Sequence, residues 1–453
     1  MAAVMDPATK MGEQRETGWV SRIFSKEAST PEYQELKFTL HRKLLDRINL
    51  EALSSMSGER VRAEVRTAVA RLVDEEKTPL SLVEKDRVIE EILDEVFGLG
   101  PLEPLLQDPT ISDILVTTPH HVYVERGGKL YRTPVEFKDD AHLLRIIEKI
   151  VSRVGRRVDE SSPMVDARLP DGSRVNAVIP PVAVDGPLLS IRRFGRYALK
   201  GEDLVAKFAL TEGMLELLKG CVKARLNILI CGGTGSGKTT LLNAVSSYIP
   251  EDERIVTIED AAELRLQQTH VARMETRPAN VEGTGAIHIR QLVINALRMR
   301  PDRIIVGEVR AEEALDMLQA MNTGHDGSLT TLHANTPRDG LGRLEVMVGM
   351  ANANMGIRSI RQQIASAVDL FVQTSRFSDG TRRVTHITEV VGMEQDIITL
   401  QDIFLFEKTG ITEAGKVRGR FRATGIRPKF YDRLKTCGIN LPTQMFQTVV
   451  EIN

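Results

Sequence analysis

The feature that most constrains this chain is a glycine-rich stretch between an apolar run and an amphipathic one. Residues 226–230 have the composition of a buried strand, and the residues after Thr240 have the pattern of a helix. Between them, residues 232–239 match G-x-x-x-x-G-K-[ST]. Glycines permit a tight turn that points successive N–H groups at an anion, and the following helix adds its positive end. A flexible linker would not lie between a strand and a helix, so the stretch predicts a nucleotide-phosphate site.

The residues of this stretch have separate expected roles. The ammonium group of Lys238 is expected to contact the β- and γ-phosphates of ATP. The hydroxyl of Thr239 is expected to bind Mg²⁺. The other expected phosphate-binding positions are Gly233, Thr234, Gly235, Ser236, Gly237 and Thr240.

Composition excludes several classes of protein. The 453 residues suggest roughly two to four domains. Lys and Arg number 60 against 62 Asp and Glu, a formal net charge of −2, so a nucleic-acid partner is not expected. The three cysteines have neither metal-ligand nor disulfide spacing, which fits a reducing cytosol. No apolar run approaches the roughly 20 residues of a membrane span, so any membrane association is expected to be peripheral.

The first two hundred residues divide into three expected parts. Residues 1–30 are expected to be a flexible tail, although Trp19, Val20, Ile23 and Phe24 share one helical face that could dock on a membrane or a partner. Residues 31–98 carry apolar stripes at helical spacing and predict a three-helix bundle. Residues 99–196 combine short strand patterns with one helix and predict a mixed α/β domain.

Residues 202–453 predict an ATPase core with a C-terminal extension. Nearly continuous apolar strands alternate with helices, which indicates a parallel sheet covered on both faces. The stretches after residue 369 are expected to be antiparallel strands that either continue this sheet or form an end hairpin. The loop at 195–201 joins the core to the preceding domain and is the expected hinge.

Three polar side chains follow predicted core strands at the point where each strand ends. They are Glu259, Glu308 and His333. Ligands of such sheets bind at the carboxyl ends of the strands. Hydrolysis of ATP needs a Mg²⁺ ligand, a carboxylate that orients or deprotonates water, and a group that senses the γ-phosphate. Glu308 and Glu259 suit the first two roles, and His333 suits the third. A lone acidic residue there is more often a helix cap; His325 and Asp326 are weaker candidates.

Arginines recur in the second domain. Arg168 and Arg174 bracket a tight hairpin, and Arg192 and Arg193 lie near the end of an apolar strand. They are either ordinary surface or ion-paired arginines, or they supply charge to a nucleotide in a neighbouring domain or subunit.

Four stretches in this order carry a family resemblance, namely residues 232–240, 257–263, 300–310 and 324–335. They resemble the Walker A, Asp, Walker B and His boxes of the secretion ATPase superfamily, which serves type II and type IV secretion and type IV pili. Three further stretches, 98–105, 167–174 and 421–428, are similar to the tight-adherence (Flp) pilus assembly ATPases of the CpaF/TadA type.

The resemblance implies a PAS-like α/β domain and a RecA-like core, assembled as a homo-hexameric ring with ATP between the two domains. It implies that Glu259 is the general base or water-positioning residue and that Glu308 lies near Mg²⁺. Arg168, Arg174 and Arg192 would stabilise the γ-phosphate.

At the level of the cell, the resemblance implies a cytoplasmic motor, peripheral at the inner membrane, that acts on pilus platform proteins during assembly or retraction. The alternatives are a type IV secretion traffic ATPase, a DNA translocase or helicase with the same core, and a weakly catalytic nucleotide switch. The presence of both Glu259 and Glu308 argues against the switch, and the balanced charge argues against DNA.

Overall fold

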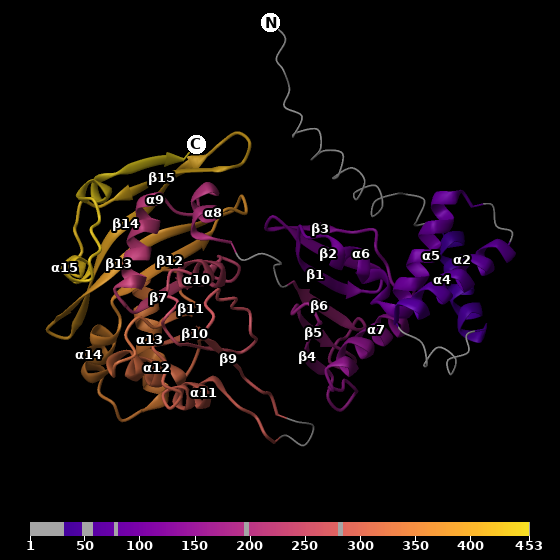
Figure 1. The fold of residues 1–453 in the computed structure, drawn as a ribbon, viewed down its shortest axis with the longest axis horizontal. Coiled ribbons are helices and arrows are strands. Elements are labelled where there is room, and N and C mark those ends of the chain that lie inside the picture. The colour runs from indigo at the N-terminus through magenta and orange to yellow at the C-terminus, as the bar shows by residue number, and fades with distance from the viewer. Residues whose placement is uncertain (1–30, 48–57, 77–79, 194–198, 280–283, 453) are drawn as a thin grey trace, which may run out of the picture. The chain divides into compact units, whose positions relative to one another are not determined.

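The computed structural model describes residues 31–47, 58–76, 80–193, 199–279 and 284–452. The chain divides into two units, Met1–Arg196 and Tyr197–Asn453, which are described separately (Figure 1). The expected tail at 1–30 and most of the expected hinge lie outside the described residues. Among the described residues, no helix is both long enough and apolar enough to cross a membrane.

The first unit begins with helices packed on one another. They are α2 (Pro31–Arg47), α4 (Gly58–Glu75) and α5 (Leu82–Phe97). Leucine, isoleucine and valine side chains at helical spacing, such as Leu40, Val69 and Ile92, form their common core. Helix α5 starts at a capping box in which Ser81 and Glu84 satisfy each other's backbone N–H groups.

A mixed α/β part follows, with short helical segments η2 (Gly100–Leu102) and α6 (Glu103–Gln107) before it. Its described strands form an antiparallel sheet in the order β3-β2-β1-β6-β5-β4. The strands are β1 (Ile111–Thr118), β2 (His121–Arg126), β3 (Lys129–Arg132), β4 (Met164–Arg168), β5 (Arg174–Val178) and β6 (Leu188–Arg192). Helix α7 (Asp140–Arg153) buries its apolar face in the same core as the inward-facing residues of these strands. The opposite side chains of β4–β6 are mostly exposed.

The second unit is built on one larger sheet, whose described strands run in the order β16-β15-β14-β13-β12-β7-β11-β10-β8-β9. Strands β12 (Leu370–Arg376), β7 (Ile228–Gly232), β11 (Leu329–Leu332), β10 (Arg303–Val309), β8 (Ile255–Glu259) and β9 (Val271–Glu275) are parallel. Strands β13 (Arg382–Glu394), β14 (Ile397–Ile411), β15 (Val417–Ala423) and β16 (Val449–Ile452) continue it antiparallel. The late strands therefore continue the core sheet and do not form a separate hairpin.

Helices cover both faces of this sheet because the strands are apolar on both faces (Figure 1). Ile228 and Ile230 of β7 pack with α9 (Glu212–Lys223) and α10 (Lys238–Ser246). Leu229 and Cys231 face the other core, which holds α11 (Ile289–Ala296), α12 (Glu313–Asn322), α13 (Pro337–Ala351) and α14 (Ile357–Ala367). The remaining helical segments are α8 (Gly201–Ala206), α15 (Tyr431–Thr436) and η3 (Thr443–Gln447). With β11 between β7 and β10, the α/β class with a RecA-like P-loop core is confirmed.

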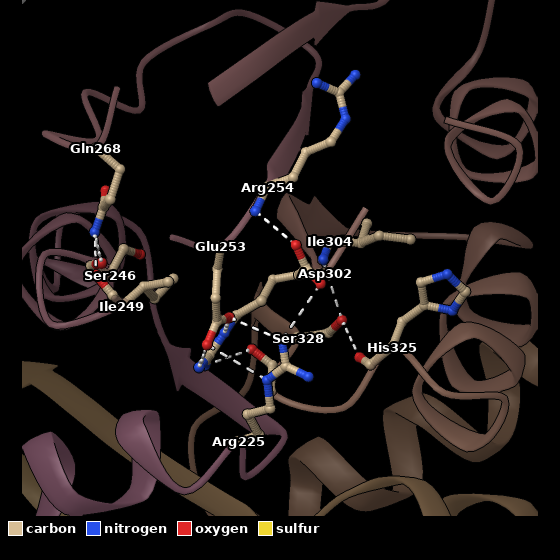
Figure 2. Close-up of polar contacts among 12 residues, drawn as sticks. Arg225, Ser246, Ile249, Glu253, Arg254, Gln268, Asp302, Ile304, His325 and Ser328 are labelled. Atoms are coloured by element: carbon tan, nitrogen blue, oxygen red, sulfur yellow. Dashed lines mark hydrogen bonds and ion pairs between the residues drawn. The ribbon is translucent and has the colours of Figure 1, made fainter. Parts of the chain in front are cut away.

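A partly buried network of charges connects the starting ends of the core strands. Arg303 is fully buried, and its Nη2 donates to Glu253 Oε1 at 3.0 Å. Arg225 Nη2 lies 3.3 Å from Glu253 Oε2 and 3.6 Å from Asp302 Oδ1, and the Arg254 N–H donates to Asp302 at 2.8 Å (Figure 2). Buried charges are tolerated when they are paired in this way. The network fixes the relative positions of β8 and β10 and leaves their carboxyl ends for other chemistry.

Candidate nucleotide site

The glycine-rich loop has the backbone of a phosphate cradle. Gly235 and Gly237 have φ values of 67° and 97°, a region that side chains with a Cβ rarely adopt. Gly237 is the N-cap of α10, so the free N–H groups of that helix face the loop. A Cβ on Gly232 would lie 2.4 Å from the Ser236 and Thr374 hydroxyl oxygens, which explains why glycine is required there. The loop therefore fits the phosphates of a nucleotide.

The side chains of the loop are arranged around Lys238. Its ammonium group donates to the Gly233 carbonyl oxygen at 3.1 Å and lies 3.4 Å from His333 Nε2. Thr234 and Gly235 are exposed at the outer side of the loop, and Ser236 is buried. Thr239 and Thr240 are half-buried in the first turn of α10.

Strand register brings the polar strand ends to the same edge of the sheet. Ile258 of β8 pairs with Val306 of β10, and Leu332 of β11 pairs with both Val309 of β10 and Cys231 of β7. Glu259 and His333 directly follow paired residues, Glu308 lies between Val306 and Val309 in β10, and the loop follows Cys231. His325 and Asp326 precede β11 and so lie at the opposite edge.

Glu259 is a buried carboxylate with one engaged oxygen. Its side chain is 3% exposed, and Oε1 accepts from the Glu263 and Leu264 N–H groups at 2.8 and 2.9 Å. Among the described residues, Oε2 has no hydrogen-bond partner. Burial raises the pKa of Glu259 to about 7, against the lowering effect of the two N–H groups. Gly307 permits this placement, because a Cβ there would lie 2.8 Å from Glu259 Cγ.

Glu308 pairs with Arg310 through Oε2 and lies close to His333 at Oε1, which has no hydrogen-bond partner among the described residues. His333 Nε2 lies 2.8 Å from Oε1, and Arg310 Nη2 donates to Oε2 at 2.7 Å. The other arm of Arg310 donates to Asp260 Oδ2 at 2.8 Å. Burial and the nearby Lys238 ammonium lower the pKa of His333, which favours its neutral imidazole. Arg310 was not predicted as a site residue from the sequence, although its position two residues after Glu308 could have indicated it.

The candidate arginines of the first unit form a row across its sheet. Arg174 pairs in register with both Arg168 and Arg192, on the face away from the core. Like charges placed directly opposite are destabilising. Two carboxylates compensate in part: Asp166 lies 3.4 Å from Arg174, and Asp113 lies 3.2 Å from Arg192. The row is therefore suited to an anionic ligand.

Oxygen donors at the site also fit Mg²⁺. The hydroxyl of Thr239 stands at the start of α10, and the carboxylate of Glu308 stands at the end of β10. Mg²⁺ prefers oxygen ligands and commonly takes one or two from protein and the rest from phosphates and water. The residues present thus fit a magnesium–nucleotide complex.

Together, the loop and the strand-end residues define a P-loop nucleotide-binding protein with a RecA-like sheet. The family model for type II/IV secretion system proteins matches residues 95–422. The chain belongs to this family of secretion ATPases, as the four boxes in its sequence indicated.

Several relatives are similar over most of the matched region. A putative conjugal transfer protein of Mycobacterium tuberculosis is 41% identical over 299 residues, which are 65% of this chain and 84% of the relative. The conjugal transfer protein TrbB of Rhizobium radiobacter is 33% identical over 291 residues, 63% of this chain and 86% of that protein. The solved VirB11 ATPase from the Brucella suis type IV secretion system is 28% identical; the match covers 66% of this chain and 95% of that one, with a TM-score of 0.35.

The raised pKa of Glu259 predicts a pH dependence. A general base acts when deprotonated, so the turnover rate at saturating ATP is expected to rise as pH increases toward about 7 and to level off above it. Phosphate release measured from about pH 5.5 to 8.5 checks this, with ADP affinity over the same range as the control for other titrations. A rate that is flat across this range, or that falls with increasing pH, would remove Glu259 from the role of base.

Proposed function

We propose that this chain is an ATP-hydrolysing motor subunit of a membrane-associated secretion or pilus assembly machine. The observation that carries the proposal is the convergence of the P-loop with Glu259, a buried carboxylate whose Oε2 has no partner among the described residues. A structural carboxylate buried this far would be expected to have both oxygens paired. The orphaned oxygen is available to a water molecule.

The proposed chemistry divides among the residues at the strand ends. Glu259 orients and deprotonates the attacking water through Oε2. Lys238 and the loop N–H groups hold the β- and γ-phosphates and stabilise the charge that develops during transfer. Thr239 and Glu308 would hold Mg²⁺, which supplies charge neutralisation on the phosphate oxygens.

His333 and Arg310 are proposed to report on the γ-phosphate. His333 lies between Lys238 and Glu308, at 3.4 and 2.8 Å. A γ-phosphate bound by Lys238 would compete with Glu308 for contact with the His333 imidazole. Movement of His333 would then loosen its contact with Glu308, and Arg310 would carry that change to Asp260 in the adjacent strand end.

The domain assignments are part of the same proposal. Residues 31–98 form a helical module, residues 99–196 form the PAS-like domain, and residues 202–453 form the motor core. The arginine row would complete the nucleotide site within a homo-hexameric ring, so that closure around ATP changes the angle between the domains.

Different observations support two alternatives for the machine to which this chain belongs. The stretches 98–105, 167–174 and 421–428 favour a tight-adherence pilus motor that acts on inner-membrane platform proteins. The similarity to conjugal transfer proteins favours the alternative, a type IV secretion traffic ATPase. The genes beside the one that encodes this chain discriminate them: prepilin, platform and secretin genes support the pilus motor, and conjugation or effector genes support the traffic ATPase.

The arginine row gives a test of the ring site. Arg168→Ala and Arg174→Ala are each expected to lower ATP turnover by about tenfold or more, because each removes charge from the transferring phosphoryl group. The melting temperature should stay level or rise, since each change relieves like-charge repulsion. The matched control is Arg132→Ala, an exposed arginine on β3 of the same sheet. Wild-type turnover in both variants would make the row an ordinary surface feature.

A further inference from the structure

A hairpin outside the sequence motifs forms a second wall of the P-loop. Strand β12 ends at Arg376 and β13 begins at Arg382. Arg382 Nε donates to the Gly235 carbonyl oxygen at 2.8 Å. A Cβ on Gly235 would lie 3.2 Å from Nη1 of Arg376. Both guanidinium groups therefore lie beside the part of the loop that cradles phosphate.

The hairpin is anchored so that it presents these arginines in a fixed place. Asp379 in the turn accepts from the Thr381 N–H at 3.0 Å and from the Val417 N–H at 2.8 Å. At the base of the hairpin, the Thr374 hydroxyl lies 2.9 Å from that of Ser236 in the loop. These hydrogen bonds connect the base of the hairpin to the P-loop and its turn to the start of β15.

The two arginines oppose each other directly. Arg376 and Arg382 are partners in the β12–β13 register, and both side chains are exposed. Directly opposed like charges destabilise a strand pair. The same arrangement occurs in the row formed by Arg168, Arg174 and Arg192. An anion placed between the guanidinium groups relieves the repulsion and accepts charge-assisted hydrogen bonds.

The order of the strands indicates which phosphates of a nucleotide would lie beside the two arginines. Strand β7 lies between β12 on one side and β11 on the other. His333 follows β11, Glu308 is the next-to-last residue of β10 and Glu259 is the last residue of β8, all on the β11 side of β7. A γ-phosphate directed toward those residues leaves the α-phosphate and the nucleoside on the β12 side of the loop.

We propose that Arg376 and Arg382 clamp the α- and β-phosphates of a bound nucleoside di- or triphosphate from within the same chain. The inference rests on the proposed function of the P-loop. The pair are positioning residues: they hold the phosphates that are not transferred and fix the carbonyl of Gly235, so that the loop N–H groups stay aligned. ADP and ATP share these phosphates, so both ligands depend on the pair equally.

The test measures the affinity of the full chain for ADP and for ATP by calorimetry. In the double variant Arg376→Gln/Arg382→Gln, both dissociation constants are expected to rise by about tenfold or more and by similar factors. The double variant Arg376→Lys/Arg382→Lys keeps the charges and should recover most of the affinity. Arg418→Gln, a change of an exposed arginine on β15, is the control and should bind as wild type does.

Four outcomes would overturn the inference. Unchanged affinities in the glutamine variant would remove the pair from the site. Loss of ATP affinity alone would place the pair at the γ-phosphate. A lower melting temperature without nucleotide, unrescued by lysine, would make its role structural. A wild-type chain that binds neither nucleotide would refute the proposed function as well, whereas the first three results leave that function standing.

Discussion

Replacing Glu259 by glutamine is expected to give a protein that binds ATP but does not hydrolyse it. Glutamine has nearly the same shape, and its carbonyl oxygen can still accept from the Glu263 and Leu264 N–H groups. It cannot take a proton from water. Loss of a positioned general base typically lowers the rate by about 10²- to 10⁴-fold. Steady-state phosphate release and ATP affinity, measured on the same preparation, check both halves of the expectation.

Glu275→Gln is the matched control for this change. Glu275 lies opposite Glu259 in the β8–β9 register, and its side chain is exposed. Its replacement should leave the rate near that of wild type. If hydrolysis persists in the Glu259→Gln variant, the role of base passes to Glu308, the other carboxylate at the strand ends.

Lys238→Ala is expected to abolish turnover for a different reason from Glu259→Gln, because it removes a phosphate contact and not the base. The ammonium group is the charge that neutralises the β- and γ-phosphates, and the side chain is only 8% exposed, so water screens it little. Loss of one preorganised donor to a developing charge costs about 10²- to 10³-fold in rate. Weaker ATP binding adds to this, because the same group contacts the ground state.

Measurements of ATP affinity and of phosphate release together distinguish the two variants. Lys238→Ala should lose binding and hydrolysis, whereas Glu259→Gln should lose hydrolysis alone. Lys416→Ala, at an exposed lysine before β15, controls for the removal of a positive charge. Unchanged turnover in Lys238→Ala would contradict the assignment of the P-loop.

Local sequence patterns were sufficient to predict the core sheet and most residues of the candidate site. Apolar strands alternating with helices set the direction of the parallel strands, and direction alone places the ends of β8, β10 and β11 at one edge. Glu259, Glu308 and His333 follow from that rule. Strand β9 was not predicted, because its residues are only partly buried and carry no continuous apolar run.

Contacts that depend on long-range pairing were not predictable from one sequence. The Ser236 and Thr374 hydroxyls meet across 138 residues of chain, and nothing local indicates that β12 lies beside β7. The pairing of Arg310 with Glu308 and Asp260 depends on side-chain rotamers, which a motif does not specify. The desolvation that raises the pKa of Glu259 likewise arises from tertiary packing.

Hydrolysis of ATP by the residues at these strand ends is tested most directly by phosphate release from the purified full chain. Wild type and Lys238→Ala are compared at saturating ATP with Mg²⁺, over time courses long enough to resolve slow turnover. Wild type is expected to release phosphate steadily, and the variant is expected to release it only at the background rate. Equal rates of phosphate release from the two proteins, whether fast or slow, would contradict hydrolysis at this site.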